Sequence, residues 1–148
     1  MECKRVRKEF KVVGMRGYGA FSDFQREVPL LAQQFLNRAS EISNHTETEI
    51  SLFEPKREEN HLEGHFYAGL LVQKPAIQVP PGMEYIEVSQ EFITIRGKIT
   101  NISSLHTELM KWAVEQGHKR NIESYIIETY HPMENDVEDV EIYLPILS

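Results

Sequence analysis

Hydrophobic and polar residues alternate with period 2 in two neighbouring segments near the C-terminus, at 126–132 and 140–146. Such alternation predicts two β-strands, and the charged segment between them predicts the turn of a β-hairpin. Alternate side chains of a strand share one face, so Glu128 lies between Ile126 and Tyr130 on its face. An ionised carboxylate among apolar groups costs several kcal/mol unless something pairs with it. The pattern therefore identifies Glu128 as a candidate ligand-binding residue.

The rest of the pattern predicts further strands and two amphipathic helices. In the first predicted helix the apolar residues recur at steps of three, four and seven, and the second helix also fits the helical period. A serine at position 103 or 104 suits the start of the second helix, and Gly117 suits its end. The expected elements are a strand at 10–15, a helix at 23–43, strands at 49–54 and 65–72, a strand at 83–96, a helix from 103 or 104 to 116, and the hairpin.

The order strand, helix, strand, strand occurs twice along the chain, which predicts an internal duplication. The two pseudo-repeats cover about 5–74 and 82–148, and the linker Pro75–Pro81 joins them within one domain over 1–148. We expect an α+β fold of duplicated β-α-β-β units that form antiparallel sheets, with one helix packed outside each sheet. The helix-free faces are then expected to meet around a central ligand groove.

Side-chain parity selects candidates for the lining of this groove. Ile126, Glu128 and Tyr130 share one face of their strand. Tyr67 shares a face with a glycine two positions later, where the missing side chain permits the close approach of another group. Phe53 shares its face with two polar residues, which turns it away from the first helix. These side chains, from three predicted strands, are expected to surround the ligand.

Composition limits the classes of function. The chain has 148 residues, which is typical of one domain, and it carries 16 Lys and Arg residues against 23 Asp and Glu residues, for a formal net charge of −7. Nucleic-acid binding needs a dense basic patch. The one basic run, at 4–8, is interpreted as a solvated edge. We therefore expect no direct nucleic-acid partner.

Several chemistries are also disfavoured. Cys3 is the only cysteine, so no intrachain disulfide and no thiolate metal cluster can form. His61 and His65 have a spacing that suits a metal on a helix, but Gly64 argues against such a helix. No nucleophile triad is recognisable, so no catalytic residue, metal or cofactor is predicted. The N-terminus resembles no secretory signal and no apolar run reaches the roughly 18 residues of a membrane span, which predicts a cytoplasmic protein.

Six segments together resemble the GyrI-like small-molecule-binding family, which also supplies the effector-binding domain of certain AraC-type and MerR-type transcription regulators. Each segment is weakly specific alone, but their order and spacing over most of the chain are typical of the family. The matching segments are 10–14, 66–72, 79–85, 109–112, 128–130 and 141–146.

The resemblance implies a central groove in which the acidic residue of a Glu-x-Tyr motif meets cationic or polar aromatic compounds. Glu128 and Tyr130 match that motif, Tyr67 matches the aromatic residue before the strand glycine, and Trp112 matches the aromatic residue of the second helix. Aromatic groups there would add cation–π contacts of about 0.5–2 kcal/mol each. Two alternative readings stay open, because Trp112 also suits a core position and Glu128 also suits a solvated strand edge.

The leading hypothesis is a stand-alone binding protein that senses or sequesters a cationic or aromatic xenobiotic, as expected of a multidrug-binding relative of transcription regulators. The chain leaves no residues for a helix-turn-helix domain, so direct operator binding is not expected. Two alternatives follow from the resemblance. One is a hydrolase of cyclopropane- or epoxide-bearing xenobiotics with Glu128 as general base, and the other is an inhibitor of a topoisomerase, DNA gyrase. A homodimer is also compatible with the sequence.

Overall fold

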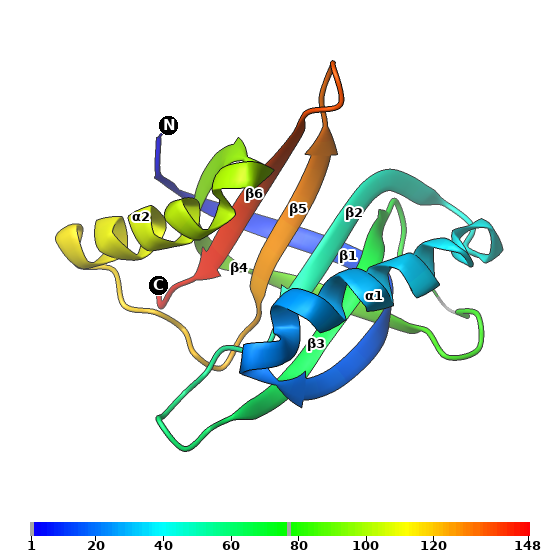
Figure 1. Ribbon diagram of the computed structural model, residues 1–148, viewed down its shortest axis with the longest axis horizontal. Coiled ribbons are helices and arrows are strands. Elements are labelled where there is room, and N and C mark those ends of the chain that lie inside the picture. Colours follow the sequence, from blue (N-terminus) through cyan, green and yellow to red (C-terminus); the bar gives the residue numbers. More distant parts are fainter. Residues whose placement is uncertain (1, 77) are drawn as a thin grey trace.

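The computed structural model describes residues 2–76 and 78–148, which form six β-strands, two α-helices and three short 3-10 helices (Figure 1). The strands are β1 (Lys4–Ala20), β2 (His45–Phe53), β3 (Glu63–Val72), β4 (Glu84–Lys98), β5 (Ile126–Pro132) and β6 (Glu138–Pro145). The helices are α1 (Phe24–Leu36) and α2 (Ile102–Glu115). The 3-10 helices lie at Phe21–Asp23, Ala39–Glu41 and Ile99–Asn101.

The strands form one closed antiparallel barrel in the order β1-β3-β2-β5-β6-β4. The first three of these strands come from the first half of the chain, and the last three come from the second half. The halves meet at two seams, where β2 pairs with β5 and β1 pairs with β4. The two halves have the same order of elements and the same pattern of strand pairing. This repetition confirms the expected α+β fold of two β-α-β-β units.

Two elements differ in length from their predicted counterparts. β1 begins at Lys4 because its first part pairs with β4 from Lys4 to Gly14, and its later part pairs with β3. The run at 4–8 therefore lies within a strand. α1 ends at Leu36, well before residue 43, and Ile42 reaches the core from a 3-10 helix beyond it. Pairing between distant segments thus extends a strand beyond its apolar alternation.

Large apolar side chains fill the interior of the barrel. Phe10 meets Phe92 and Tyr143 edge to face, with ring centroids 5.7 and 5.0 Å apart. Two further clusters lie outside the barrel, where α1 packs on β1 and β3 and α2 packs on β4 and β6. The interior cluster consists of Phe10, Val12, Ile50, Leu52, Tyr67, Val88, Phe92, Ile127 and Tyr143.

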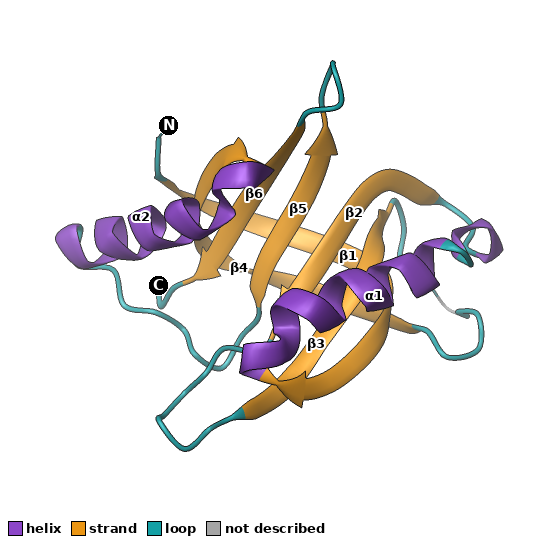
Figure 2. Ribbon diagram, viewed as in Figure 1, coloured by secondary structure: helices purple, strands orange, loops and turns teal. Residues whose placement is uncertain are grey.

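The helices lie outside the barrel with β2 and β5 between them (Figure 2). Each helix covers the sheet of its own half, as the sequence predicts. The predicted position of the groove, between the helix-free faces, is occupied by the interior cluster because large side chains from both sheets interlock there. A cavity of about 700 Å³ instead lies between the two helices.

β1 and β3 approach closely where two glycines face each other. Gly14 and Gly69 are direct partners in the antiparallel register. A Cβ atom added at Gly69 would lie 2.5 Å from the carbonyl oxygen of Val13, and one added at Gly14 would lie 2.7 Å from the carbonyl oxygen of Ala68. Such distances are far inside van der Waals contact. The glycine pair therefore permits the spacing of these strands under α1.

We expect Gly69→Ala to lower the free energy of unfolding by about 1–3 kcal/mol, because the new methyl group would overlap the backbone of β1. Gly19→Ala is the matched control, since a Cβ atom at Gly19 in the same strand pair would have nothing within 4 Å. Urea unfolding of the three proteins measures the difference. Equal stability of the two variants would contradict the close approach.

Candidate functional site

A cavity of about 700 Å³ lies between α1 and α2, over the seam of β2 and β5. Its volume is in the range of small-molecule sites. The seam is left uncovered because each helix packs on the other two strands of its own half. The lining comprises Phe21, Phe24, Gln25, Val28, Pro29 and Ala32 on or near α1; Glu49, Ser51, Phe53, Glu54, Pro55 and Lys56 on or after β2; Ile99, Ile102, Ser103 and His106 at the start of α2; Ile126, Glu128 and Tyr130 on β5; and Glu138 on β6.

Glu128 lines this groove from β5 and is only 7% exposed. One of its carboxylate oxygens accepts a hydrogen bond from the Tyr130 hydroxyl at 2.7 Å. The other lies 2.7 Å from Nε2 of His106, which reaches across from α2. Both oxygens of the buried carboxylate are thus paired with groups that carry protons, and the carboxylate is held in one orientation.

Tyr130 is a neutral hydrogen-bond donor in this network. Burial raises the pKa of its hydroxyl well above the ordinary value, and the nearby Glu128 carboxylate raises it further. The phenol and carboxylate lie two residues apart on one strand, so the period of the strand brings them to the same face. The network therefore keeps its donor protonated throughout the physiological pH range.

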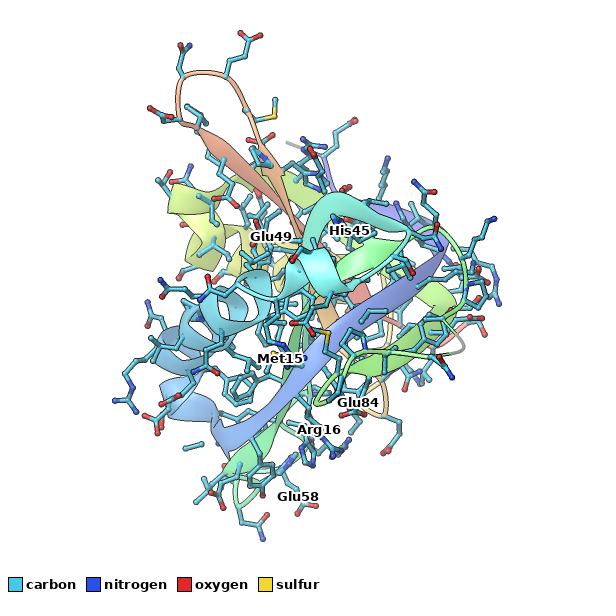
Figure 3. The ribbon with its side chains drawn as sticks, turned by 90° about the vertical axis from the view of Figure 1, so that its right-hand side faces the viewer. Met15, Arg16, His45, Glu49, Glu58 and Glu84 are labelled. Carbon is cyan, nitrogen blue, oxygen red and sulfur yellow. The ribbon has the colours of Figure 1, made fainter. Side chains whose placement is uncertain are left out.

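Carboxylates outnumber cations in the lining of the groove. It contains Glu49, Glu54, Glu128 and Glu138 against Lys56 alone, apart from the titratable His106. Burial raises the pKa of Glu49, which projects from β2 (Figure 3), and repulsion from Glu138 raises it further. Neither of these two carboxylates has an ion-pair partner among residues 2–76 and 78–148. The field of the groove therefore favours a cation.

Glu54 differs from the other carboxylates of the lining. It accepts hydrogen bonds from Arg57 and from the backbone N–H of His65, both at 2.8 Å, and it lies 3.1 Å from Nε2 of His61. These donors lower the pKa of its carboxyl although burial opposes them. Glu54 consequently ties the loop after β2 to β3, and His61 belongs to that structural cluster.

An aromatic wall closes one side of the groove. Phe24 at the start of α1 lies 6.1 Å from Phe53 and 4.9 Å from Phe66, measured between ring centroids. Phe21 lies 5.2 Å from Phe24. The wall offers ring faces and edges to an aromatic ligand, close to the buried carboxylate.

The structure brings four of the six predicted site residues to one cavity. They come from the two strands of the uncovered seam, and their side chains share its outer face. These four residues are Glu128, Tyr130, Ile126 and Phe53.

The other two predicted site residues lie elsewhere. Tyr67 belongs to the interior cluster and stacks edge to face on Tyr125, and its hydroxyl lies 3.5 Å from Glu84. Glu84 pairs with Arg16 at 3.3 Å on the side of the barrel (Figure 3). Trp112 packs against the core under α2, with its ring 5.4 Å from the ring of His118.

Sequence reasoning missed His106. The residue lies one helical turn after Ile102, which also lines the groove, and it borders the apolar stripe of α2. The sequence signal for such a residue is its place on the helix. It is polar, it borders the apolar stripe, and it follows a residue of that stripe by four positions. The pairing partner cannot be read from that signal, because Glu128 lies 22 residues further along the chain.

The described residues contain no candidate metal site and no helix suited to a membrane. No group of three or more His, Cys, Asp or Glu side chains in 2–76 and 78–148 is arranged to hold a metal ion. No described helix combines the length and the apolar character needed to cross a membrane.

Comparison with known proteins identifies relatives of the whole fold. The family model of Cass2, the integron-associated effector binding protein, matches residues 6–146. The integron cassette protein VCH_CASS2 of Vibrio cholerae is 17% identical with a TM-score of 0.65, over 98% of this chain and 95% of that one. No curated protein matches the sequence.

Two other solved structures are also similar. SAV2435, solved bound to tetraphenylphosphonium, has a TM-score of 0.75 at 11% identity, over 100% of this chain and 95% of that one. The C-terminal domain of EcmrR has a TM-score of 0.68 at 15% identity, over 99% and 98%. At these identities the likeness establishes the fold.

The raised pKa values of three tyrosines predict that the fold loses stability at alkaline pH. A hydroxyl whose pKa is higher in the folded state stabilises the fold below its ordinary pKa of about 10, and this contribution is lost as the pH rises through the folded-state value. Burial raises the pKa of Tyr130 in this way, and it raises the pKa values of Tyr67 and Tyr85 to about 12. We therefore expect the free energy of unfolding to fall above about pH 10.

The share of Tyr130 is measured by the variant Tyr130→Phe, which lacks the titrating hydroxyl. Urea unfolding of both proteins between about pH 9 and pH 11.5 should show a shallower decline for the variant. Identical slopes would show that the Tyr130 proton is not linked to folding.

Proposed function

The chain belongs to the Cass2 family of integron-associated effector-binding proteins, and we propose that it binds a small lipophilic cation in the groove between α1 and α2. The observation that carries this proposal is Glu128, a carboxylate only 7% exposed in the lining of a cavity of about 700 Å³. A buried charge is costly to keep. Its position in the lining of a ligand-sized groove favours a partner of opposite charge.

The walls of the groove indicate what surrounds that charge. Phenylalanine rings on one side and aliphatic side chains from both helices suit a ligand with extensive apolar surface. SAV2435, which has the same fold, was solved with tetraphenylphosphonium, a cation whose charge lies beneath four phenyl rings. A ligand of that kind needs apolar walls together with a nearby negative charge, and both are present in this groove.

The proposed contacts follow from the lining. Glu128 supplies the charge, Tyr130 orients the carboxylate, and Phe53 and Ile126 contribute apolar contact beside it. Trp112 and the interior tyrosine at position 67 are not part of this proposed set. The role that we propose is to sense or to sequester the ligand. Support for a link to transcription comes from EcmrR, which was solved in a complex with DNA and whose C-terminal domain has the same fold.

We expect Glu128→Gln to weaken tetraphenylphosphonium binding by about 1–3 kcal/mol, or roughly 5- to 150-fold in Kd, because the charge-assisted contact is lost. Stability should change less than affinity, since an amide oxygen still accepts from Tyr130 and an amide N–H donates to neutral imidazole. Glu87→Gln is the matched control, because Glu87 is exposed on β4 outside the lining. Isothermal titration calorimetry measures the affinities. Equal Kd values for the two variants would refute the assigned role of Glu128.

Hydrolysis of an electrophilic ring is a second candidate, favoured by the two proton-bearing neighbours of Glu128. In this reaction Glu128 takes a proton from water, the water oxygen bonds to a carbon of an epoxide, and His106 protonates the oxygen that leaves that carbon. The raised pKa of Tyr130 makes it an orienting donor here rather than the acid. Mass spectrometry of an aromatic epoxide incubated with the protein distinguishes the candidates, because hydrolysis adds the mass of one water.

A further inference from the structure

We propose that His106 is the internal counter-ion of Glu128, and that a cation binds in the groove by expelling the proton of the His106 imidazolium. This inference rests on the proposed function, since it concerns how the same groove selects and releases its ligand. The two side chains come from opposite sides of the site, His106 from α2 and Glu128 from the floor strand β5.

The geometry of the pair is that of a strong hydrogen bond. Nε2 of His106 lies 2.7 Å from Oε2 of Glu128, which is the short distance expected of a charge-assisted contact. The Glu128 side chain is 9% exposed, whereas the His106 side chain is 33% exposed. The imidazole is therefore the more exposed partner of the pair, and it can exchange a proton with solvent while Glu128 stays covered.

Within the described part of the chain, the groove contains one cation besides the His106 imidazolium, which is Lys56. From β5 it faces Glu128 and Tyr130, and the strands beside β5 contribute Glu49 and Glu138. α1 contributes no charged side chain to the lining. Lys56, after β2, and the donor-bound Glu54 are the remaining charged groups of the groove. His106 is thus the one histidine among the described residues that line the groove, and histidine is the side chain type whose charge ordinarily changes near neutral pH.

Two positive charges cannot both be fully compensated by the single Glu128 carboxylate. With the imidazolium present, the pair is electrically neutral, and a ligand cation gains little from it. With neutral imidazole, the carboxylate retains its charge while the N–H of the ring still holds it in place. Protonation of His106 and binding of a cation therefore oppose each other, and the coupling between them is reciprocal.

The sign of the resulting pH dependence follows from this coupling. Below the pH at which His106 gains its proton, the Kd for a permanent cation should rise by up to about tenfold per pH unit, with up to one proton released per cation bound. Above that pH the Kd should be constant. A neutral ligand of similar shape should show neither effect. The His106–Glu128 pair therefore lets the groove bind cations at neutral pH and release them when the pH falls.

Isothermal titration calorimetry tests the inference with tetraphenylphosphonium, which has no titratable group of its own. Titrations run from about pH 5.5 to pH 8.5 around the ordinary histidine pKa, each in two buffers of different ionisation enthalpy so that released protons are counted. The proteins are the wild type, His106→Gln, which keeps an N–H donor without a titratable charge, and His118→Gln. The last is the matched control, because His118 stacks on Trp112 outside the groove. Triphenylphosphine oxide is the neutral ligand.

We expect the Kd of the wild type and of His118→Gln to fall as the pH rises, with proton release on binding at low pH. His106→Gln should bind with a Kd that is flat over this range, should release no proton, and should bind more tightly than the wild type at the acidic end.

Three results would overturn the inference. If the wild type binds with a Kd that does not depend on pH, or if His106→Gln keeps the pH dependence, His106 is not the counter-ion, while the proposed binding function stands. If no variant binds tetraphenylphosphonium at any pH, the proposed function and this inference fail together.

Discussion

β2 and β5 pair with Ser51 opposite Glu128, and this seam joins the two halves of the barrel. Each half has one helix, which packs on the two strands of that half that lie away from the seam. The seam is therefore the part of the outer surface that neither helix covers. That one pairing determines where the groove lies between α1 and α2 and which side chains form its floor. A shift of the pairing by a single residue would turn Glu128 toward the barrel interior.

The filled interior determines which face of the barrel receives a ligand. Phe10, Phe92 and Tyr143 interlock at the centre, and they leave the ligand-sized space outside. The buried carboxylate on the outer face is consequently the feature that needs an explanation. Its hydrogen bonds to Tyr130 and His106 hold it in one orientation, and the proposed binding of a cation gives a reason for keeping a charge there.

Local pattern was sufficient to predict both helices and the presence of six strands, because the helices have a helical period and the strands of the C-terminal hairpin alternate with period 2. The same period placed Ile126, Glu128 and Tyr130 on one face, where the structure has them. Parity alone does not say which face of a strand is inside. For that reason the sequence grouped Tyr67 with the groove, although closure of the barrel turns it inward. The partnership of His106 with Glu128 was out of reach for a similar reason, since it depends on how α2 is placed over the sheet.

The most direct test of this account is a crystal structure of the protein with tetraphenylphosphonium. The account predicts the phosphonium between α1 and α2, over the Glu128 carboxylate, with a phenyl ring against Phe53. A ligand bound within the barrel, or on a face away from the seam of β2 and β5, would contradict it.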